Sequence, residues 1–211
     1  MIPGPLATKA RPFYSVRVSK GAATRTSILD EALHVASQVG FEGLSIGQLA
    51  DRTEMSKSGL FAHFRSKEQL QLQTLDHAVA RFTDIVVRPT LKAPRGESRV
   101  RELFERWLDW ETDSLAGGCV FATAAVEYDD QPGEMHDALV RQQRDWTEFI
   151  ATVAGTAASE GEFRSDLDTR QFAFTLQALM FGYRHAGRLL RDPDALERTR
   201  AAFEQLLDSS R

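Results

Sequence analysis

The sequence of 211 residues lacks the features that mark secreted and membrane proteins. It has one cysteine, Cys119, so no disulfide can form within the chain, and a reducing, cytoplasmic environment is expected. No run approaches the ~18 consecutive apolar residues that a membrane span requires. The opening stretch MIPGPLATKARPFY has no apolar segment typical of a signal peptide, so we expect no membrane partner.

Sequence motifs that are typical of metal sites and of catalytic sites are also absent. The five histidines show no spacing with cysteine that is typical of a zinc site. No nucleophile elbow, phosphate loop or HExxH sequence occurs. We therefore predict no catalytic residues, no metal and no cofactor.

The charge that is present is unevenly distributed. The net charge of −4 argues against a protein that coats nucleic acid over its whole surface. Residues 1–70, however, contain nine Lys/Arg and six Asp/Glu, a net of +3, whereas residues 71–211 contain 17 and 24, a net of −7. A basic head therefore precedes an acidic body.

Apolar residues recur at helical spacing along the chain and no segment alternates like a strand, which predicts an all-α fold of roughly nine helices. Gly40 is expected to close the first helix. Ser45, Ser56 and Ser66 each stand where they can cap the next helix, so three helices should begin near residues 46, 57 and 67.

Three further expectations concern the body. The fourth helix should end at about Arg88, because Pro89 follows it. The stretch CVFATAAV, residues 119–126, is apolar enough to be buried on all sides. Asp192 and Pro193 should cap the last helix.

The stretch MSKSGLFAHFRSK, residues 55–67, predicts a short helix with an unusual surface. Leu60 and Phe64 share one side at i, i+4 spacing. The opposite side carries small residues: Ser58, Gly59 and Ala62. Small side chains allow a backbone to approach base edges in the DNA major groove. Together with the preceding short helix and the turn TEM, the pattern predicts a helix-turn-helix.

The sequence FEGLSIGQLADRTEMSKSGLFAHFRSKEQL, residues 41–70, strongly resembles the DNA-binding domain of the tetracycline-repressor (TetR) family, and the resemblance covers residues 24–70 closely. It implies a three-helix domain that binds double-stranded operator DNA. In that family the following all-α body binds a small-molecule effector and forms a homodimer, and ligand binding usually weakens operator binding. The body of this chain matches the family in length and composition.

The resemblance, together with the free N–H groups of helix N-termini, assigns DNA contacts to eight residues. Ser45, His63 and Lys67 match contacts to phosphate in the family, and the start of the third helix matches the residues that read bases. The full set is Ser45, Ser56, Lys57, Ser58, Gly59, Phe61, His63 and Lys67.

Three places differ from the family pattern. Glu54 stands where a turn glycine is common, so a left-handed conformation there would be strained. Phe61 replaces the usual tyrosine and lacks its hydroxyl. Ser58 and Gly59 replace glycine followed by threonine, so the operator sequence cannot be taken from relatives.

Aromatic side chains in the body suggest a pocket for a small, mostly apolar ligand. The candidates are Trp107, Trp110, Phe121, Tyr128, Trp146, Phe149, Phe172 and Tyr183. Most of them are expected to belong to the core alone. Cys119 lies among apolar neighbours and should be buried and unreactive. The last two helices are the expected dimer interface, through the stripe Leu176, Met180, Tyr183, Leu190, Leu196, Phe203 and Leu207.

The predicted organisation is a flexible basic arm over residues 1–22, a helix-turn-helix DNA-binding domain over residues 23–70, and an all-α ligand-binding and dimerisation domain over residues 71–211. The expected function is a cytoplasmic, sequence-specific transcriptional regulator, most readily a repressor that a small apolar ligand releases from its operator. The alternative is an all-α enzyme or small-molecule carrier with an accessory helix-turn-helix, which would need a catalytic pair that the sequence does not display.

Overall fold

The computed structural model describes residues 20–211, and every regular element among them is a helix, which confirms the all-α prediction. The predicted arm, residues 1–22, lies outside the described residues except for its last three, which begin the first helix. The helices are α1 Lys20–Gly43, α2 Ile46–Thr53, α3 Lys57–Phe64, α4 Lys67–Phe82, α5 Arg88–Lys92, α6 Glu97–Thr112, α7 Val120–Glu127, α8 Glu134–Ser159, α9 Thr169–Arg184 and α10 Ala195–Ser210, with π-helical segments η1 Thr83–Val87 and η2 His185–Leu189.

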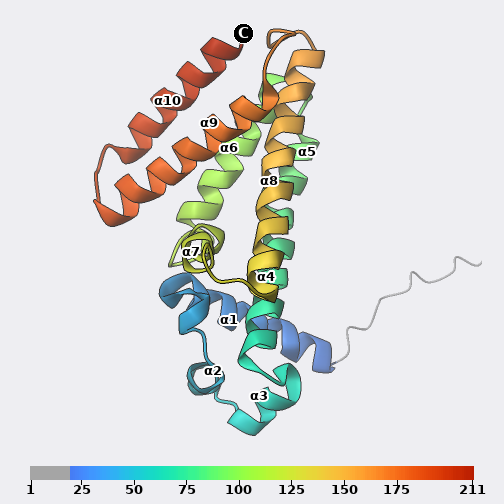
Figure 1. The fold of residues 1–211 in the computed structure, drawn as a ribbon, viewed down its shortest axis with the longest axis vertical. Coiled ribbons are helices and arrows are strands. Elements are labelled where there is room, and N and C mark those ends of the chain that lie inside the picture. The colour runs from blue at the N-terminus through green and yellow to red at the C-terminus, as the bar shows by residue number, and fades with distance from the viewer. Residues whose placement is uncertain (1–19) are drawn as a thin grey trace, which may run out of the picture.

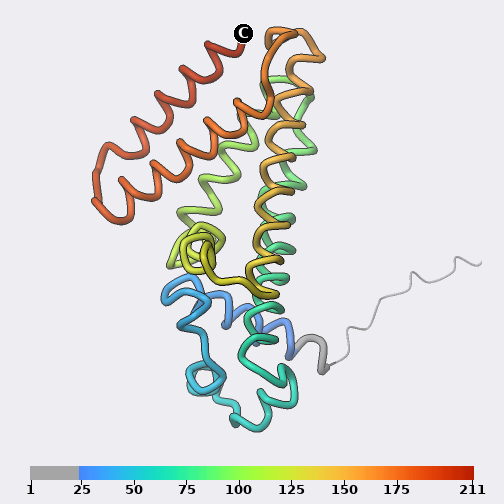
Figure 2. Tube along the Cα trace, in the orientation of Figure 1, coloured from blue at the N-terminus to red at the C-terminus, as the bar shows by residue number. Residues whose placement is uncertain are grey.

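The helices form a small head and a larger body (Figure 1). Helices α1, α2 and α3 make up one end of the molecule, and α4 leads from that end into the body. The chain trace in Figure 2 shows the short α7 next to α1, between the head and the upper helices. Helices α9 and α10 run antiparallel and pack against each other at the far end.

Serine caps explain why the three helices of the head begin where the sequence predicts. The hydroxyl oxygen of Ser45 accepts a hydrogen bond from the backbone N–H of Gln48 at 3.2 Å. Ser56 and Ser66 make the same contact with residues 59 and 69, both at 3.1 Å. Each cap satisfies a backbone donor that a helix start would otherwise leave free. The predicted starts near residues 46, 57 and 67 are therefore confirmed.

One of the two predicted helix ends is confirmed and the other is not. Gly40 leaves the helical conformation (φ 79°, ψ 169°) and ends the long first part of α1, and a short separate turn, residues 41–43, follows it. The helical segment that begins with α4 does not end at Arg88. It continues through the π-helical η1 and then through α5, as far as Lys92. The π-helical turn places Pro89, which lacks an N–H, where the hydrogen-bond ladder is already irregular.

Two predictions for the body also need correction. Val126 is 73% exposed, so the segment 119–126 is not buried on all sides. Helix α7 buries one face, with Val120, Phe121 and Ala124, and leaves the other open. The last helix begins at residue 195, and Asp192 instead closes the preceding turn, where its carboxylate accepts from the backbone N–H of residue 194 at 3.0 Å.

The stripe predicted for the dimer interface faces mostly into the subunit. Leu176, Met180, Phe203 and Leu207 are buried within the chain itself, where α9 and α10 pack on the body. Leu190 and Leu196 of the stripe are exposed, at 62% and 41%, but the apolar side chains that α9 and η2 themselves leave exposed lie outside the stripe: Phe174, Phe181 and Leu189. The helical period was correct, but the rotation of α9 about its axis was not.

The backbones of head and body come close together at Gly117, in the loop between α6 and α7. Its backbone N–H donates to the hydroxyl of Ser37 on α1 at 3.2 Å. A Cβ atom on Gly117 would lie 1.6 Å from the backbone oxygen of Ser37, so no larger residue fits while the two segments keep this distance.

We predict that Gly117→Ala lowers the free energy of unfolding by about 1 to 3 kcal/mol, because the new methyl group must push the loop from the α1 backbone. Denaturant unfolding would measure it. Gly155→Ala is the matched control: it lies inside α8, and its nearest neighbour would be 3.7 Å away. The control should be neutral or stabilising by up to about 1 kcal/mol. Equal effects of the two substitutions would contradict the close approach.

Candidate DNA-binding surface and ligand pocket

Helix α3 presents the surface that the sequence predicts for a recognition helix. Leu60 and Phe64 are buried against the head, at 0% and 1% exposure. Phe61 is 51% exposed, and Ser58 and Ala62 also face solvent. The outward face is thus smooth except for one aromatic ring at its edge.

The turn before α3 has the strained conformation that was expected. Glu54 adopts a left-handed conformation (φ 55°, ψ 27°), and its N–H closes α2 on the carbonyl of Ala50. A residue other than glycine is unfavourable there. The turn sets the angle between α2 and α3, so it controls how the recognition helix is presented.

The N-termini of α2 and α3 lie close to the predicted cations. The side-chain ends of Lys57 and the hydroxyl of Ser45 both lie within 4.0 Å of where a Cβ on Gly47 would stand. Ser56 caps α3 and its hydroxyl is 3.1 Å from that of Ser58. The structure therefore gathers polar groups from both helices around two N-termini, where backbone N–H groups favour an anion.

Lys67 stands at the third N-terminus, that of α4, and its ammonium is already engaged. Nζ donates to the backbone oxygen of Glu42 at 2.7 Å and lies 3.4 Å from the Glu42 carboxylate. The Lys67 side chain is still 47% exposed. His63 is partly exposed near the end of α3, and its ring lies 6.1 Å from that of Phe64.

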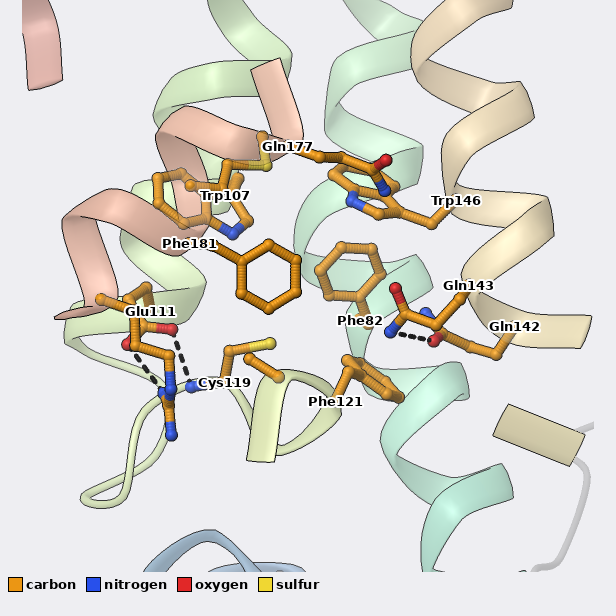
Figure 3. Close-up of a pocket in the computed structure, with 13 residues that line it drawn as sticks. Phe82, Trp107, Glu111, Cys119, Phe121, Gln142, Gln143, Trp146, Gln177 and Phe181 are labelled. Carbon is orange, nitrogen blue, oxygen red and sulfur yellow. Dashed lines mark hydrogen bonds and ion pairs between the residues drawn. The ribbon is translucent and has the colours of Figure 1, made fainter. Parts of the chain in front are cut away.

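The body contains a pocket bounded by α4, α6, α7, α8 and α9. Figure 3 shows the aromatic side chains around it: Phe82, Trp107, Phe121, Trp146 and Phe181. Four of these are almost completely buried, whereas Phe181 is 47% exposed and stands at the opening. The cavity volume is only about 40 Å³. The space between the lining side chains, including the part that is open to solvent, is about 470 Å³. A drug-sized ligand therefore requires side chains to move.

Only three of the eight aromatic residues predicted to line a pocket line this one: Trp107, Phe121 and Trp146. The other five do not line this pocket, because their helices turn them elsewhere. Trp110 is wholly buried, and Tyr183 packs edge to face on Trp107. Phe149, Phe172 and Tyr128 border three separate grooves.

Polar groups of the pocket were missed. Three glutamines line it, Gln142, Gln143 and Gln177, and so do Glu111 and Arg184. The helical period could have located them. Gln142 and Gln143 share a helix face with Trp146, and Gln177 and Arg184 share a face with Phe181. Period alone does not show which face meets the pocket.

Glu111 and Arg184 form a buried ion pair on one side of the pocket. Nη1 of Arg184 is 2.9 Å from Oε1 of Glu111, whose side chain is 2% exposed. The other Glu111 oxygen accepts from the backbone N–H of Cys119 at 2.9 Å. Arg184 also donates to the hydroxyl of Thr123 at 2.7 Å. Both charges are thus neutralised within the protein, and the wall of the pocket carries no net charge.

Cys119 has the environment that the sequence predicts. Its side chain is buried, and burial together with the nearby Glu111 carboxylate raises the pKa of the thiol. A raised pKa leaves little thiolate at neutral pH, so the thiol is a poor nucleophile. Among residues 20–211, no three His, Cys, Asp or Glu side chains gather as a metal would require. Over the same residues no helix has both the length and the apolar character to cross a bilayer.

These features define a helical regulator with a helix-turn-helix head. Residues 28–74 match the family model for bacterial regulatory proteins of the tetR family, and residues 96–203 match that for the tetracyclin repressor-like C-terminal domain. The chain therefore belongs to the TetR family.

Individual relatives agree with this assignment. The transcriptional regulator TcmR of Streptomyces glaucescens is 27% identical over 93% of this chain and 86% of its own length. The transcriptional repressor NicS of Pseudomonas putida is 32% identical, over 42% of each chain. A TetR transcriptional regulator from Chloroflexus aurantiacus has a similar fold, with a TM-score of 0.79 and 26% identity over 90% of this chain and 94% of the other.

We predict that Arg184→Leu lowers the free energy of unfolding by about 3 kcal/mol, because it leaves the Glu111 carboxylate buried without its cation. Arg188→Leu is the matched control, since that arginine is exposed and reaches only a backbone oxygen at 3.3 Å among the described residues; about 0.5 kcal/mol is expected. Adding Glu111→Gln to Arg184→Leu should recover part of the loss. Equal losses for the two arginine variants would contradict the importance of the pair.

Proposed function

We propose that this protein is a ligand-responsive transcriptional repressor that binds a near-palindromic operator as a homodimer. The observation that carries the proposal is the smooth, exposed face of α3 on a helix-turn-helix head of the TetR family. A single helix of eight residues is about 12 Å long and reads few bases, so selectivity requires two half-sites. DNA as partner implies a cytoplasmic location, and we propose that the chain catalyses no reaction.

The proposed division of labour follows the two ends of the molecule. Residues 23–70 hold the DNA contacts: Lys57, Ser58 and Gly59 face bases, and the other predicted residues face phosphates. Residues 71–211 hold the pocket and the dimer interface. The exposed apolar residues of α9 and η2, Phe174, Phe181 and Leu189, support an interface on that face.

The pocket favours a neutral, largely aromatic ligand with groups that form hydrogen bonds. Its walls are aromatic and its one ion pair is internally neutralised. The side-chain N–H of Gln143 donates to the Gln142 oxygen at 3.0 Å, and the Gln177 oxygen is 3.3 Å from the Thr147 hydroxyl. The remaining amide groups, including the Gln142 N–H and the Gln143 oxygen, can bind polar atoms of a ligand.

A gel-shift assay with the DNA upstream of the protein's own gene tests the proposal. We expect a sequence-specific complex that contains two chains, and light scattering should show a dimer at micromolar concentration. A thermal-shift screen of neutral aromatic compounds should identify ligands that also dissociate the complex. The coupling should be reciprocal and about 1 to 3 kcal/mol. No specific shift together with binding of a small molecule would instead favour the carrier alternative.

Phe61 provides a test of how α3 lies against DNA. We predict that Phe61→Tyr tightens binding by about 0.5 to 1.5 kcal/mol per half-site, because its exposed ring edge would place a hydroxyl near phosphate. The gain should be equal for operator and scrambled DNA. Ser58→Ala is the comparison: it lies on the smooth face and should alter base preference at one position. A change of base preference in Phe61→Tyr would show that the rotation of the helix is wrong.

A further inference from the structure

The last turn of α1, residues 40–43, is held by the end of α7. The carboxylate of Glu127 accepts a hydrogen bond from the backbone N–H of Phe41 at 2.8 Å. The hydroxyl of Tyr128, the residue after α7, donates to Oε1 of Glu42 at 2.7 Å. A Cβ on Gly40 would lie 1.6 Å from Glu127, so the glycine leaves the room that this carboxylate occupies.

The same turn is held from the other side by α4. The side-chain amide of Gln71 donates to the backbone oxygen of Phe41 at 2.7 Å, in a buried position. The ammonium of Lys67 donates to the backbone oxygen of Glu42 and lies beside its carboxylate. Glu42 therefore contacts Tyr128 of the body and Lys67 of the proposed DNA surface at once.

Burial differs along this row of three side chains. Tyr128 is 5% exposed, whereas the side chains of Glu42 and Lys67 are 49% and 47% exposed. The hydrogen bond from Tyr128 and the nearby Lys67 lower the pKa of the Glu42 carboxyl, so it is ionised at neutral pH. Burial and the Glu42 charge raise the pKa of the Tyr128 hydroxyl, which therefore remains a donor. Tyr128, at one end of the row, is therefore fixed by burial, whereas Lys67, at the other end, reaches solvent.

We propose that Tyr128 is a positioning residue, which acts through Glu42 to hold the Lys67 ammonium where it can bind a DNA phosphate. The inference rests on the proposed DNA-binding function. An exposed lysine and glutamate contribute little stability as a pair, so stability alone does not account for the arrangement. A free lysine loses rotamer freedom when it binds phosphate, and a lysine already held in place loses less. Lys67 has three N–H donors, so a donor remains for a phosphate.

The test compares Tyr128→Phe, Lys67→Ala and the double variant by gel shift, at two salt concentrations, on the shifted DNA fragment and a scrambled duplex of equal length. Tyr128→Phe keeps the buried ring and removes only the hydroxyl. We expect it to weaken binding to both duplexes by about threefold to tenfold. Lys67→Ala should weaken both and reduce the salt dependence by about one released counterion per subunit. In the Lys67→Ala background, Tyr128→Phe should have no further effect.

Ser37→Ala is the matched control. It also removes a hydrogen bond between α1 and the α7 region, that to Gly117, but it does not touch Glu42 or Lys67. It should lower the free energy of unfolding while DNA affinity stays within about twofold.

Three results would overturn the inference. Independent, multiplicative effects of Tyr128→Phe and Lys67→Ala would make Tyr128 a structural residue only. Tighter binding by Tyr128→Phe would mean that Glu42 competes with phosphate for Lys67. Normal affinity and salt dependence in Lys67→Ala would remove the contact and leave the proposed function intact. If the unaltered protein shifts no DNA, the proposed function fails as well.

Discussion

The edge-to-face contacts of one aromatic ring, Phe82, hold the body together. Its centroid lies 5.3 Å from Trp110, 5.5 Å from Phe121 and 4.9 Å from Trp146. Because Phe82 ends α4 and its three neighbours lie on α6, α7 and α8, a single side chain joins four helices. Such contacts add to the free energy that the burial of large rings already provides. The same ring lines the pocket, so the shape of the pocket and the packing of the core cannot change independently.

The buried ion pair has a second consequence for the pocket. Taking Glu111 and Arg184 out of water is costly, and the cost is offset because each also bonds to a neighbouring polar group. The pair also connects α6 with the end of α9 across the loop that carries Gly117. One wall of the pocket is therefore built from the loop that touches α1, and the other walls come from the short α7 and from the long helices α4, α6, α8 and α9.

Local signals in the sequence were sufficient for the head. The caps at Ser45, Ser56 and Ser66 act over three residues, so their effect can be read without knowledge of the tertiary fold. The inward side of α3 followed from Leu60 and Phe64 in the same way. The family resemblance then supplied a function that pattern alone could not.

The body was less predictable, because its site depends on contacts between distant segments. Glu111 and Arg184 are separated by 73 residues, and nothing local pairs them. Trp107 and Trp110 lie on one helix, but only Trp107 lines the pocket. Their spacing in the sequence does not show which of the two tryptophans lines the pocket. That depends on how α6 is rotated about its axis against α4 and α8. The same ambiguity of rotation explains why the exposed residues of α9 were misidentified.

The length of α7 limits how the body can respond to a bound molecule. The helix has eight residues, about 12 Å, and its first turn carries Phe121 of the pocket wall while its last residue is Glu127, bonded to α1. So short a helix has too few turns to absorb a displacement by bending. A ligand that displaces the backbone of α7 at Phe121 must therefore move the far end by a similar amount, and the hydrogen bond between Glu127 and Phe41 must either follow the motion or break.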